Sequence, residues 1–203
     1  MPSSQETYRR KKWEFYRYKS KRPLKERLAL RSKWWKLWQE ARAKNVSGTS
    51  QKAIDMIKAF EGFSPYAYDD GVGVSTIGYG TTSADVSPLP KRVSFEEGEK
   101  ILKKALKEKY EPDVKAAEAR YGIKFSQAEF DALVSFVYNL GPGAVGTAKG
   151  FSTLQGALAS KNRPAIANAL LLYTNPGTSV HAGLLRRRKA EKELFLNGKY
   201  PAK

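Results

Sequence analysis

Residues 51–80, QKAIDMIKAFEGFSPYAYDDGVGVSTIGYG, change their periodicity within one short stretch. Apolar residues recur at helical spacing up to Phe60, and Glu61-Gly62 follows, where glycine is suited to end a helix. Residues 66–82 then mix Tyr, Val, Ile and Thr with glycines, which predicts short strands joined by tight turns. The stretch therefore predicts a helix that ends at Glu61 and leads into a small β region.

The chain after this region has the pattern of a helical domain. Capping boxes are predicted at Ser94 with Glu97 and at Ser126 with Glu129. Further helices are expected near residues 152–160, 163–173 and 183–196. Strands followed by many helices predict an α+β fold in which the small sheet forms one wall of a cleft.

The composition excludes several kinds of site. The 203 residues include no cysteine, which excludes disulfides, thiolate metal sites and a thiol nucleophile. The single histidine, His181, argues against a histidine-rich metal cluster, so we expect neither a metal nor a cofactor. We expect no signal peptide and no transmembrane segment, because no window approaches the roughly 20 apolar residues that span a bilayer.

The net charge of +17 is concentrated in the first quarter of the chain. Residues 1–48 carry 15 Lys and Arg against 4 Asp and Glu, whereas residues 49–203 carry 22 against 16. The polar stretch 45–50 separates the two parts. We therefore predict a basic extension over residues 1–48 and a second domain over residues 49–203. Pro23 divides the extension into a predicted helical hairpin.

All the tryptophans of the chain lie in this extension, at Trp13, Trp34, Trp35 and Trp38. Basic residues interleaved with aromatic ones can bind an anionic membrane surface, an anionic wall polymer or single-stranded nucleic acid. The alternative is that the tryptophan stripe packs within the hairpin or against the second domain. No nucleic-acid motif is present, so we do not expect specific nucleic-acid binding.

Glu61, Asp70 and Thr76 can place two carboxyl groups and a hydroxyl around one cavity. Glycoside hydrolysis needs one protonated carboxyl to protonate the leaving oxygen and one ionised carboxyl to orient water or stabilise positive charge. A carboxyl at a helix C-terminus faces the negative end of the helix dipole, which favours its protonated form. Glu61 therefore suits the acid. Spacing alone leaves open that Glu61 and Asp70 are ordinary surface carboxylates.

Three separated motifs carry a family resemblance. They are IKAFEG at 57–62 with YDD at 68–70 and GVSTIGYG at 73–80, FDALVSFVYNLG at 130–141, and GLLRRRKAE at 183–191. Together they resemble the phage lysozymes of glycoside hydrolase family 24 over about residues 50–198. The resemblance implies a lysozyme-like α+β fold, with a small β-sheet lobe and a larger helical lobe around a cleft. In one departure, Thr81 stands where family members commonly have His.

By this resemblance Glu61 is the general acid, and Asp70 and Thr76 position the attacking water. Gly80, Asn139 and Arg187 are the residues expected to contact substrate or to approach the catalytic Glu. Two alternatives stay open from the residues alone. Arg187 could lie on a solvated helix face, since Arg186 and Arg188 are equally available. Asn139 could instead cap the helix end before Gly141.

The resemblance implies a monomeric endolysin that acts on bacterial peptidoglycan. It implies cleavage of the β-1,4 bond between N-acetylmuramic acid and N-acetylglucosamine, with inversion, for host cell lysis. The expected location is the host cytoplasm before release to the wall. Two rivals remain: a lytic transglycosylase acting on the same bond, and a cationic envelope-disrupting protein that acts through residues 1–48. Tyr66, Tyr68 and Tyr79 could line the cleft or serve packing.

Overall fold

The computed structural model describes residues 46–69 and 73–201, together with Pro23, Lys25, Glu26, Ala29 and Lys33. The chain divides into two compact units, residues 1–41 and 42–203. In the first unit the described residues Lys25, Glu26, Ala29 and Lys33 are helical and exposed. The rest of the predicted hairpin and its four tryptophans lie outside the described residues, as does Asp70.

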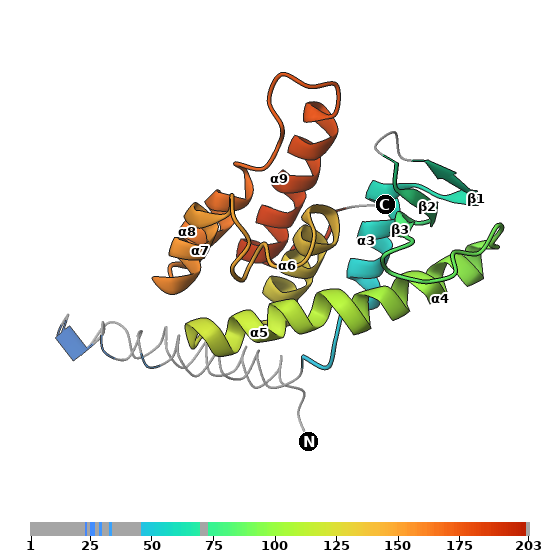
Figure 1. Ribbon diagram of the computed structural model, residues 1–203. Helices are drawn as coiled ribbons and strands as arrows, with labels where there is room; N and C mark the ends of the chain where they lie inside the picture. Colours follow the sequence, from blue (N-terminus) through green and yellow to red (C-terminus); the bar gives the residue numbers. More distant parts are fainter. Residues whose placement is uncertain are drawn as a thin grey trace. The chain divides into compact units, whose positions relative to one another are not determined.

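The second unit has the α+β architecture that the sequence predicts (Figure 1). Its elements in chain order are α3 (Gln51–Glu61), β1 (Ser64–Asp69), β2 (Ser75–Gly78), β3 (Thr81–Thr82), α4 (Phe95–Ala105), the π-helix η1 (Leu106–Tyr110), α5 (Glu111–Tyr121), α6 (Gln127–Leu140), α7 (Ser152–Ala159), α8 (Arg163–Leu170) and α9 (His181–Asn197). The helix end at Glu61 and both capping boxes are confirmed.

The three strands form one antiparallel sheet in the order β1-β2-β3. Tyr68 pairs with Thr76 between β1 and β2, and Thr76 pairs with Thr82 between β2 and β3. Strand β1 is largely exposed, whereas Thr76, Ile77 and Gly78 of β2 are buried. The sheet therefore turns β2 toward the interior and leaves β1 at its edge.

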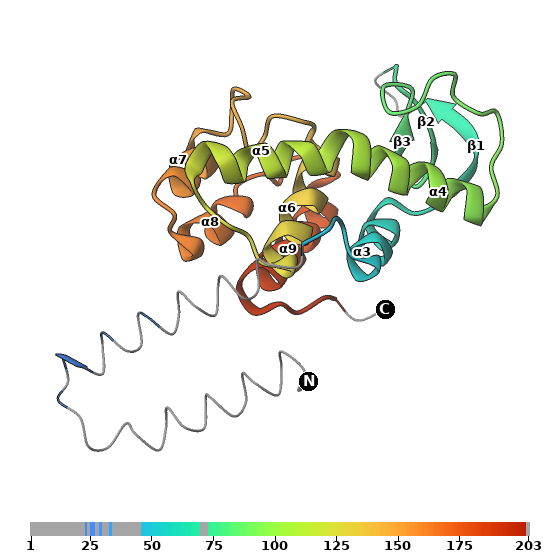
Figure 2. The ribbon, with the colours of Figure 1, turned by 90° about the horizontal axis from the view of Figure 1, so that it is seen from below.

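A nearly continuous helical run connects the sheet to the rest of the unit. Helices α4, η1 and α5 follow one another without a loop, and Figure 2 shows this run passing from the sheet at one end to α7 and α8 at the other. Pro112 stands in the first turn of α5 and has no N–H, so it donates no backbone hydrogen bond at this junction. The sequence did not predict the π-helical turn, because no local motif marks it.

Helix α6 forms the centre of the core. Every residue from Ala128 to Tyr138 is buried, which is the pattern of a helix surrounded by other elements rather than one lying on a surface. Helix α9 packs along it, as both ribbon views show. Arg187, Arg188 and Glu191 of α9 are buried at this contact. Burial of three charged side chains on one helix demands partners for each of them.

The polar stretch that the sequence suggests as a boundary is tied to the second unit. The Gln127 amide donates to the carbonyl of Gly48 at 2.8 Å. Thr49 donates to Glu111 through both its backbone N–H and its hydroxyl. Ser50 caps α3 and also donates to the fully buried Asp131 at 2.6 Å. Residues 48–50 thus fix the start of α3 against α5 and α6.

Two predicted helix bounds differ from the structure by more than one residue. Helix α8 ends at Leu170, three residues before the predicted end, because the chain turns there toward the Asn175-Pro176-Gly177 segment. Helix α9 begins at His181, two residues before the predicted start, and the His181 ring bonds the Thr174 carbonyl oxygen at 2.9 Å. That contact uses His181 structurally, since it joins the start of α9 to the segment before it.

An ion-paired cluster joins α3 to α4. Glu99 accepts hydrogen bonds from Lys103 at 2.7 Å and from Lys58 at 2.5 Å. The Lys103 and Lys58 ammonium groups lower the pKa of Glu99 from its usual 4.5 to about 2. A carboxyl whose pKa is lower in the folded state stabilises that state above its unfolded pKa, and this stabilisation is lost as the pH falls through the folded value.

We therefore expect Glu99→Gln to lower the free energy of unfolding by about 1 kcal/mol near neutral pH, a modest value because the group is partly exposed. The difference from wild type should be complete above about pH 5, decline below 4.5 and vanish below about pH 2. Urea unfolding at each pH measures it, with the exposed Glu108→Gln as the matched control. A difference that is unchanged at pH 2 would show that charge is not its cause.

Candidate functional site

Glu61 occupies the last residue of α3, so its side chain leaves the helix at the end that faces the sheet. The helix ends there because Gly62 adopts φ +71°, a conformation that favours glycine, and donates its N–H to the Lys58 carbonyl. Ala53, Ile54, Met56 and Ile57 bury one side of the helix, and Glu61 follows Ile57 by four residues on that side. Helix packing therefore fixes the position from which the Glu61 carboxyl group projects.

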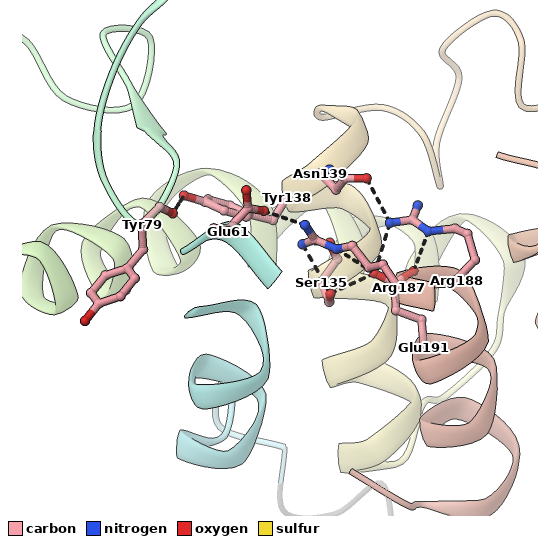
Figure 3. A network of polar contacts seen from close by, with 8 residues as sticks. All are labelled: Glu61, Tyr79, Ser135, Tyr138, Asn139, Arg187, Arg188 and Glu191. Atoms are coloured by element: carbon pink, nitrogen blue, oxygen red, sulfur yellow. Dashed lines mark hydrogen bonds and ion pairs between the residues drawn. The ribbon is translucent and has the colours of Figure 1, made fainter. Parts of the chain in front are cut away.

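Arg187 is the basic residue that meets this carboxyl group. Its Nη1 donates to Oε1 of Glu61 at 2.5 Å, and its side chain is 4% exposed (Figure 3). Arg186 and Arg187 both lie over the Phe60 ring, at 5.8 and 5.5 Å from its centroid, but Arg186 is exposed. The interpretation of Arg187 as part of a solvated helix face is wrong, since the packing of α9 on α6 brings it inside.

Gly80 lies against the other oxygen of the same carboxyl group. A Cβ atom at Gly80 would stand 2.9 Å from Oε2 of Glu61, and the residue has φ +78°. Arginine only donates hydrogen bonds, so a proton on Glu61 cannot lie between Oε1 and Arg187. The oxygen that can carry a proton is therefore Oε2, the one next to Gly80.

Thr76 and Asp70 are the other two residues predicted to take part in catalysis, and the structure describes only Thr76. Thr76 is 4% exposed on β2, and its hydroxyl donates to the Val74 carbonyl oxygen at 3.3 Å. Asp70 follows Asp69, the last residue of β1, which pairs with Ser75 next to Thr76. The sheet register thus brings the chain just before Asp70 beside Thr76, while Asp70 itself lies outside the described residues.

Asn139 belongs to a buried polar network rather than to a helix cap. Its Oδ1 accepts a hydrogen bond from Nη2 of Arg188 at 2.9 Å. The end of α6 is closed instead by Gly141, whose N–H donates to the Val137 carbonyl. Asn139 and the Glu61–Arg187 pair are thereby linked through Arg188 and Glu191 (Figure 3).

Glu191 is the centre of this network and is fully buried. Its Oε1 accepts from Ser135 Oγ at 2.7 Å, from Arg187 Nε at 3.2 Å and from Arg188 Nη2 at 3.2 Å. Its Oε2 is ion-paired with Arg188 Nε at 3.0 Å without the geometry of a hydrogen bond. Three donors to one carboxyl group indicate the carboxylate form.

Burial disfavours the charged forms of the side chains in this network. It lowers the pKa of Arg188 to about 10, against the attraction of Glu191, so Arg188 stays cationic at neutral pH. Burial also raises the pKa of Glu191, and the neighbouring Arg188 and Arg187 oppose that rise. The Arg188 guanidinium gains a further contact with the Phe136 ring, 4.7 Å from its centroid.

Tyrosines form the side of the site between the sheet and α6. The Tyr138 hydroxyl donates to the carbonyl oxygen of Tyr79 at 2.7 Å, which ties α6 to the turn that contains Gly80. Burial raises the pKa of Tyr138 and holds the phenol neutral. Thr81, at the position of the family histidine, is 1% exposed, and its hydroxyl lies near that of Tyr138 without hydrogen-bond geometry.

The three tyrosines of the sheet region have different surroundings. Tyr79 is buried and packs on Phe63 with ring centroids 4.9 Å apart, so it serves packing. Tyr66 and Tyr68 are 58% and 46% exposed on β1. Arg92 lies over the Tyr66 ring at 5.7 Å from its centroid.

Sequence reasoning missed Ser135, Tyr138, Arg188 and Glu191 as parts of the site. One signal was available, because Arg187 and Arg188 precede Glu191 by four and three residues, spacings that bring helix side chains together. The serine and the tyrosine give no such signal. Their roles follow only from the packing of α6 against α9 and the sheet.

Other features of the described residues do not add to the site. No group of three or more His, Asp or Glu side chains among them is arranged to hold a metal ion. None of their helices is both long and apolar enough to cross a membrane. A groove of about 750 Å³ lies between α3, α9 and the segment after α9, lined by Lys52, Met56, Phe60, Arg186 and Tyr200 among others.

Comparison with known proteins matches residues 58–191 to the phage lysozyme family. The endolysin of Bacillus phage B103 is 38% identical over 151 residues, which cover 73% of this chain and 54% of that protein. The endolysin of Salmonella phage P22 is 32% identical over 151 residues, covering 73% of this chain and 97% of that one. The chain thus spans about half the length of the Bacillus phage relative and nearly all of the Salmonella phage relative.

Solved structures agree with this assignment. The muramidase domain of SpmX from Asticaccaulis excentricus has a TM-score of 0.58 and 31% identity, covering 73% of this chain and 97% of that one. The endolysin from Escherichia coli O157:H7 phage FAHEc1 has a TM-score of 0.58 and 28% identity, covering 78% and 99%. The fold is lysozyme-like, and the chain belongs to the phage lysozyme family.

Proposed function

We propose that this protein is an endolysin of glycoside hydrolase family 24, an N-acetylmuramidase that hydrolyses the β-1,4 bond between N-acetylmuramic acid and N-acetylglucosamine. The observation that carries the proposal is the environment of Glu61. Its Oε1 is occupied by Arg187, and its Oε2 is the oxygen left to hold a proton. Membership of the phage lysozyme family and likeness to a muramidase domain support the substrate class.

In this mechanism Glu61 protonates the glycosidic oxygen as the bond to the anomeric carbon breaks. Asp70 and Thr76 position the water that attacks the opposite face of the sugar, which inverts the anomeric configuration. Water loses a proton to Asp70, and Glu61 ends as the carboxylate. Arg187 stays bound to Oε1 throughout, so the charge that develops on Glu61 has a partner in place.

Asn139 and Gly80 have supporting roles in the proposal. Gly80 leaves room beside Oε2, since any side chain there would occupy the path of the proton to the substrate. Oδ1 of Asn139 accepts a hydrogen bond from Arg188. The amide N–H groups of Asn139 are therefore available to donate to a substrate carbonyl or hydroxyl.

The basic extension is proposed to bind the anionic envelope, either wall polymer or membrane surface. The concentration of positive charge and of tryptophan in residues 1–48 supports this. The full chain with Trp34, Trp35 and Trp38 changed to Ala tests it by sedimentation with purified walls and with anionic lipid vesicles across a salt series. Weaker binding with unchanged hydrolysis of a soluble fragment is the expected result, and unchanged binding would contradict the proposal.

Mass spectrometry of released muropeptides tests the chemistry. A muramidase yields fragments with reducing N-acetylmuramic acid ends, whereas a transglycosylase yields anhydro ends, which weigh one water less. We expect reducing ends from the wild type and none from Glu61→Gln. Anhydro products would replace the hydrolase assignment with the transglycosylase one.

We further propose, from the likeness to endolysins, that the protein accumulates in the host cytoplasm and acts as a monomer once it reaches the wall.

A further inference from the structure

Arg187 is held by contacts on every side of its guanidinium group. Its Nε donates to Glu191, its Nη2 donates to the Ser135 carbonyl oxygen at 3.0 Å, and its Nη1 donates to Glu61. The planar group has a fixed arrangement of donors, so two of these contacts determine where the third one points. Glu191 and α6 therefore set the direction in which Arg187 approaches Glu61.

Glu191 also balances the charge around the site. Two buried arginines, Arg187 and Arg188, stand beside two carboxyl groups, Glu61 and Glu191. If Glu191 were neutral, both cations would act on Glu61 alone, and the ionised form of that residue would be favoured. A general acid needs the opposite, because it must hold its proton until the substrate takes it.

We propose that Glu191 is a positioning residue for the hydrolytic reaction: it orients Arg187 on Oε1 of Glu61 and offsets its charge, so that Glu61 keeps a transferable proton on Oε2. This inference rests on the proposed function. Ser135 supports the arrangement from α6, since its hydroxyl donates to Glu191 and its carbonyl accepts from Arg187. Arg188 extends it to Asn139.

Among the described residues, the groups that can affect the protonation of Glu61 come from several elements around it. They are Arg187, Arg188 and Glu191 from α9, Tyr138 from α6, Tyr110 from η1, and Asp85 from the segment before α4, which accepts a hydrogen bond from Tyr110. Burial raises the pKa values of Tyr110 and Tyr138, so both phenols stay neutral where the enzyme is assayed. Lys109 pairs with Asp85 at 2.7 Å. Among these groups, Glu191 and Arg188 are therefore the main residues whose substitution changes the charge near Glu61 without altering Glu61 or Arg187.

The test is the pH dependence of kcat and KM on a soluble peptidoglycan fragment, measured for the full chain with Glu191→Gln. The glutamine keeps the shape and removes the charge. We expect kcat to fall roughly 10- to 100-fold with KM nearly unchanged, as for a misaligned catalytic group. The upper limb of the pH–rate profile, which reports loss of the acid's proton, should move to lower pH by about one unit.

Three variants separate positioning from a merely structural role. Glu191→Asp keeps the charge, so its upper limb should stay at the wild-type pH although kcat falls. Glu193→Gln makes the same substitution on an exposed face of α9 and should leave both kcat and the pH profile unchanged. Loss of stability alone would lower the active fraction of Glu191→Gln without moving the limb, and that result overturns the inference.

If Glu191→Gln does not fold, as circular dichroism would show, Ser135→Ala takes its place. It removes only the hydroxyl donor to Glu191. We expect kcat to fall about threefold at constant KM, and on a free-energy scale a threefold change is roughly half of a tenfold change. A wild-type kcat for Ser135→Ala would then overturn the inference. Failure of the proposed function looks different, because the wild type itself would release no reducing muropeptides.

Discussion

Glu61→Gln is expected to reduce the rate of peptidoglycan hydrolysis by roughly 10²- to 10⁴-fold, the contribution typical of a general acid. The glutamine keeps the size of the side chain, and its carbonyl oxygen can still accept the hydrogen bond that Arg187 donates to Oε1. Its NH₂ group, however, stands where Oε2 would carry the proton and cannot protonate a leaving oxygen. Release of reducing ends from purified walls measures the change.

The fold of this variant should be preserved. Glu191 and Ser135 still hold Arg187 when the charge of Glu61 is removed, so the melting temperature is expected to change little. The exposed Glu108→Gln is the matched control and should hydrolyse walls at the wild-type rate. A Glu61→Gln protein that clears walls like the wild type would refute the assignment of Glu61 as the acid.

Gly80→Ala should lower kcat by roughly 10²-fold, because its methyl group would displace the Glu61 carboxyl group. The added Cβ would lie 2.9 Å from Oε2 and 3.1 Å from the carboxyl carbon. The carboxyl group is held on its other side by Arg187, so it can yield only by breaking that contact or by moving away from the substrate. Steady-state kinetics on a soluble fragment should show the loss mainly in kcat.

Backbone strain needs its own control, since Gly80 has φ +78° and any side chain there is disfavoured. Gly150→Ala provides it, because Gly150 has φ +89° and an added Cβ would meet no atom within 4 Å. Both variants should lose comparable stability in urea unfolding, while only Gly80→Ala loses activity. Equal activities would show that the contact with Glu61 does not limit catalysis.

The sequence predicted those parts of the fold that depend on near neighbours in the chain. The end of α3 at Glu61 follows from Gly62, and the starts of α4 and α6 follow from Ser94 with Glu97 and Ser126 with Glu129. Each of these features is a contact within four residues. The π-helical turn η1 was not predicted, because no local motif marks it.

The candidate site was only partly predictable. Motif resemblance named Glu61, Gly80 and Arg187, and the structure brings these three together. It also named Asn139, whose partner proves to be Arg188. The placement of Asp70 and the substrate contacts of Asn139 remain predictions. Glu191, the residue on which the positioning proposal depends, carried no role in the sequence reasoning.

The sequence by itself determined the end of α3, the starts of α4 and α6, where the positive charge lies, and which carboxyl group stands at a helix end. Without the family resemblance, the residue pattern could not choose among Arg186, Arg187 and Arg188. Successive helical residues point about 100° apart, so the rotation of α9 against α6 decides which of them enters the core. That rotation is set by apolar packing across residues far apart in the chain, and it is what places Arg187 on Glu61 and Glu191 behind it.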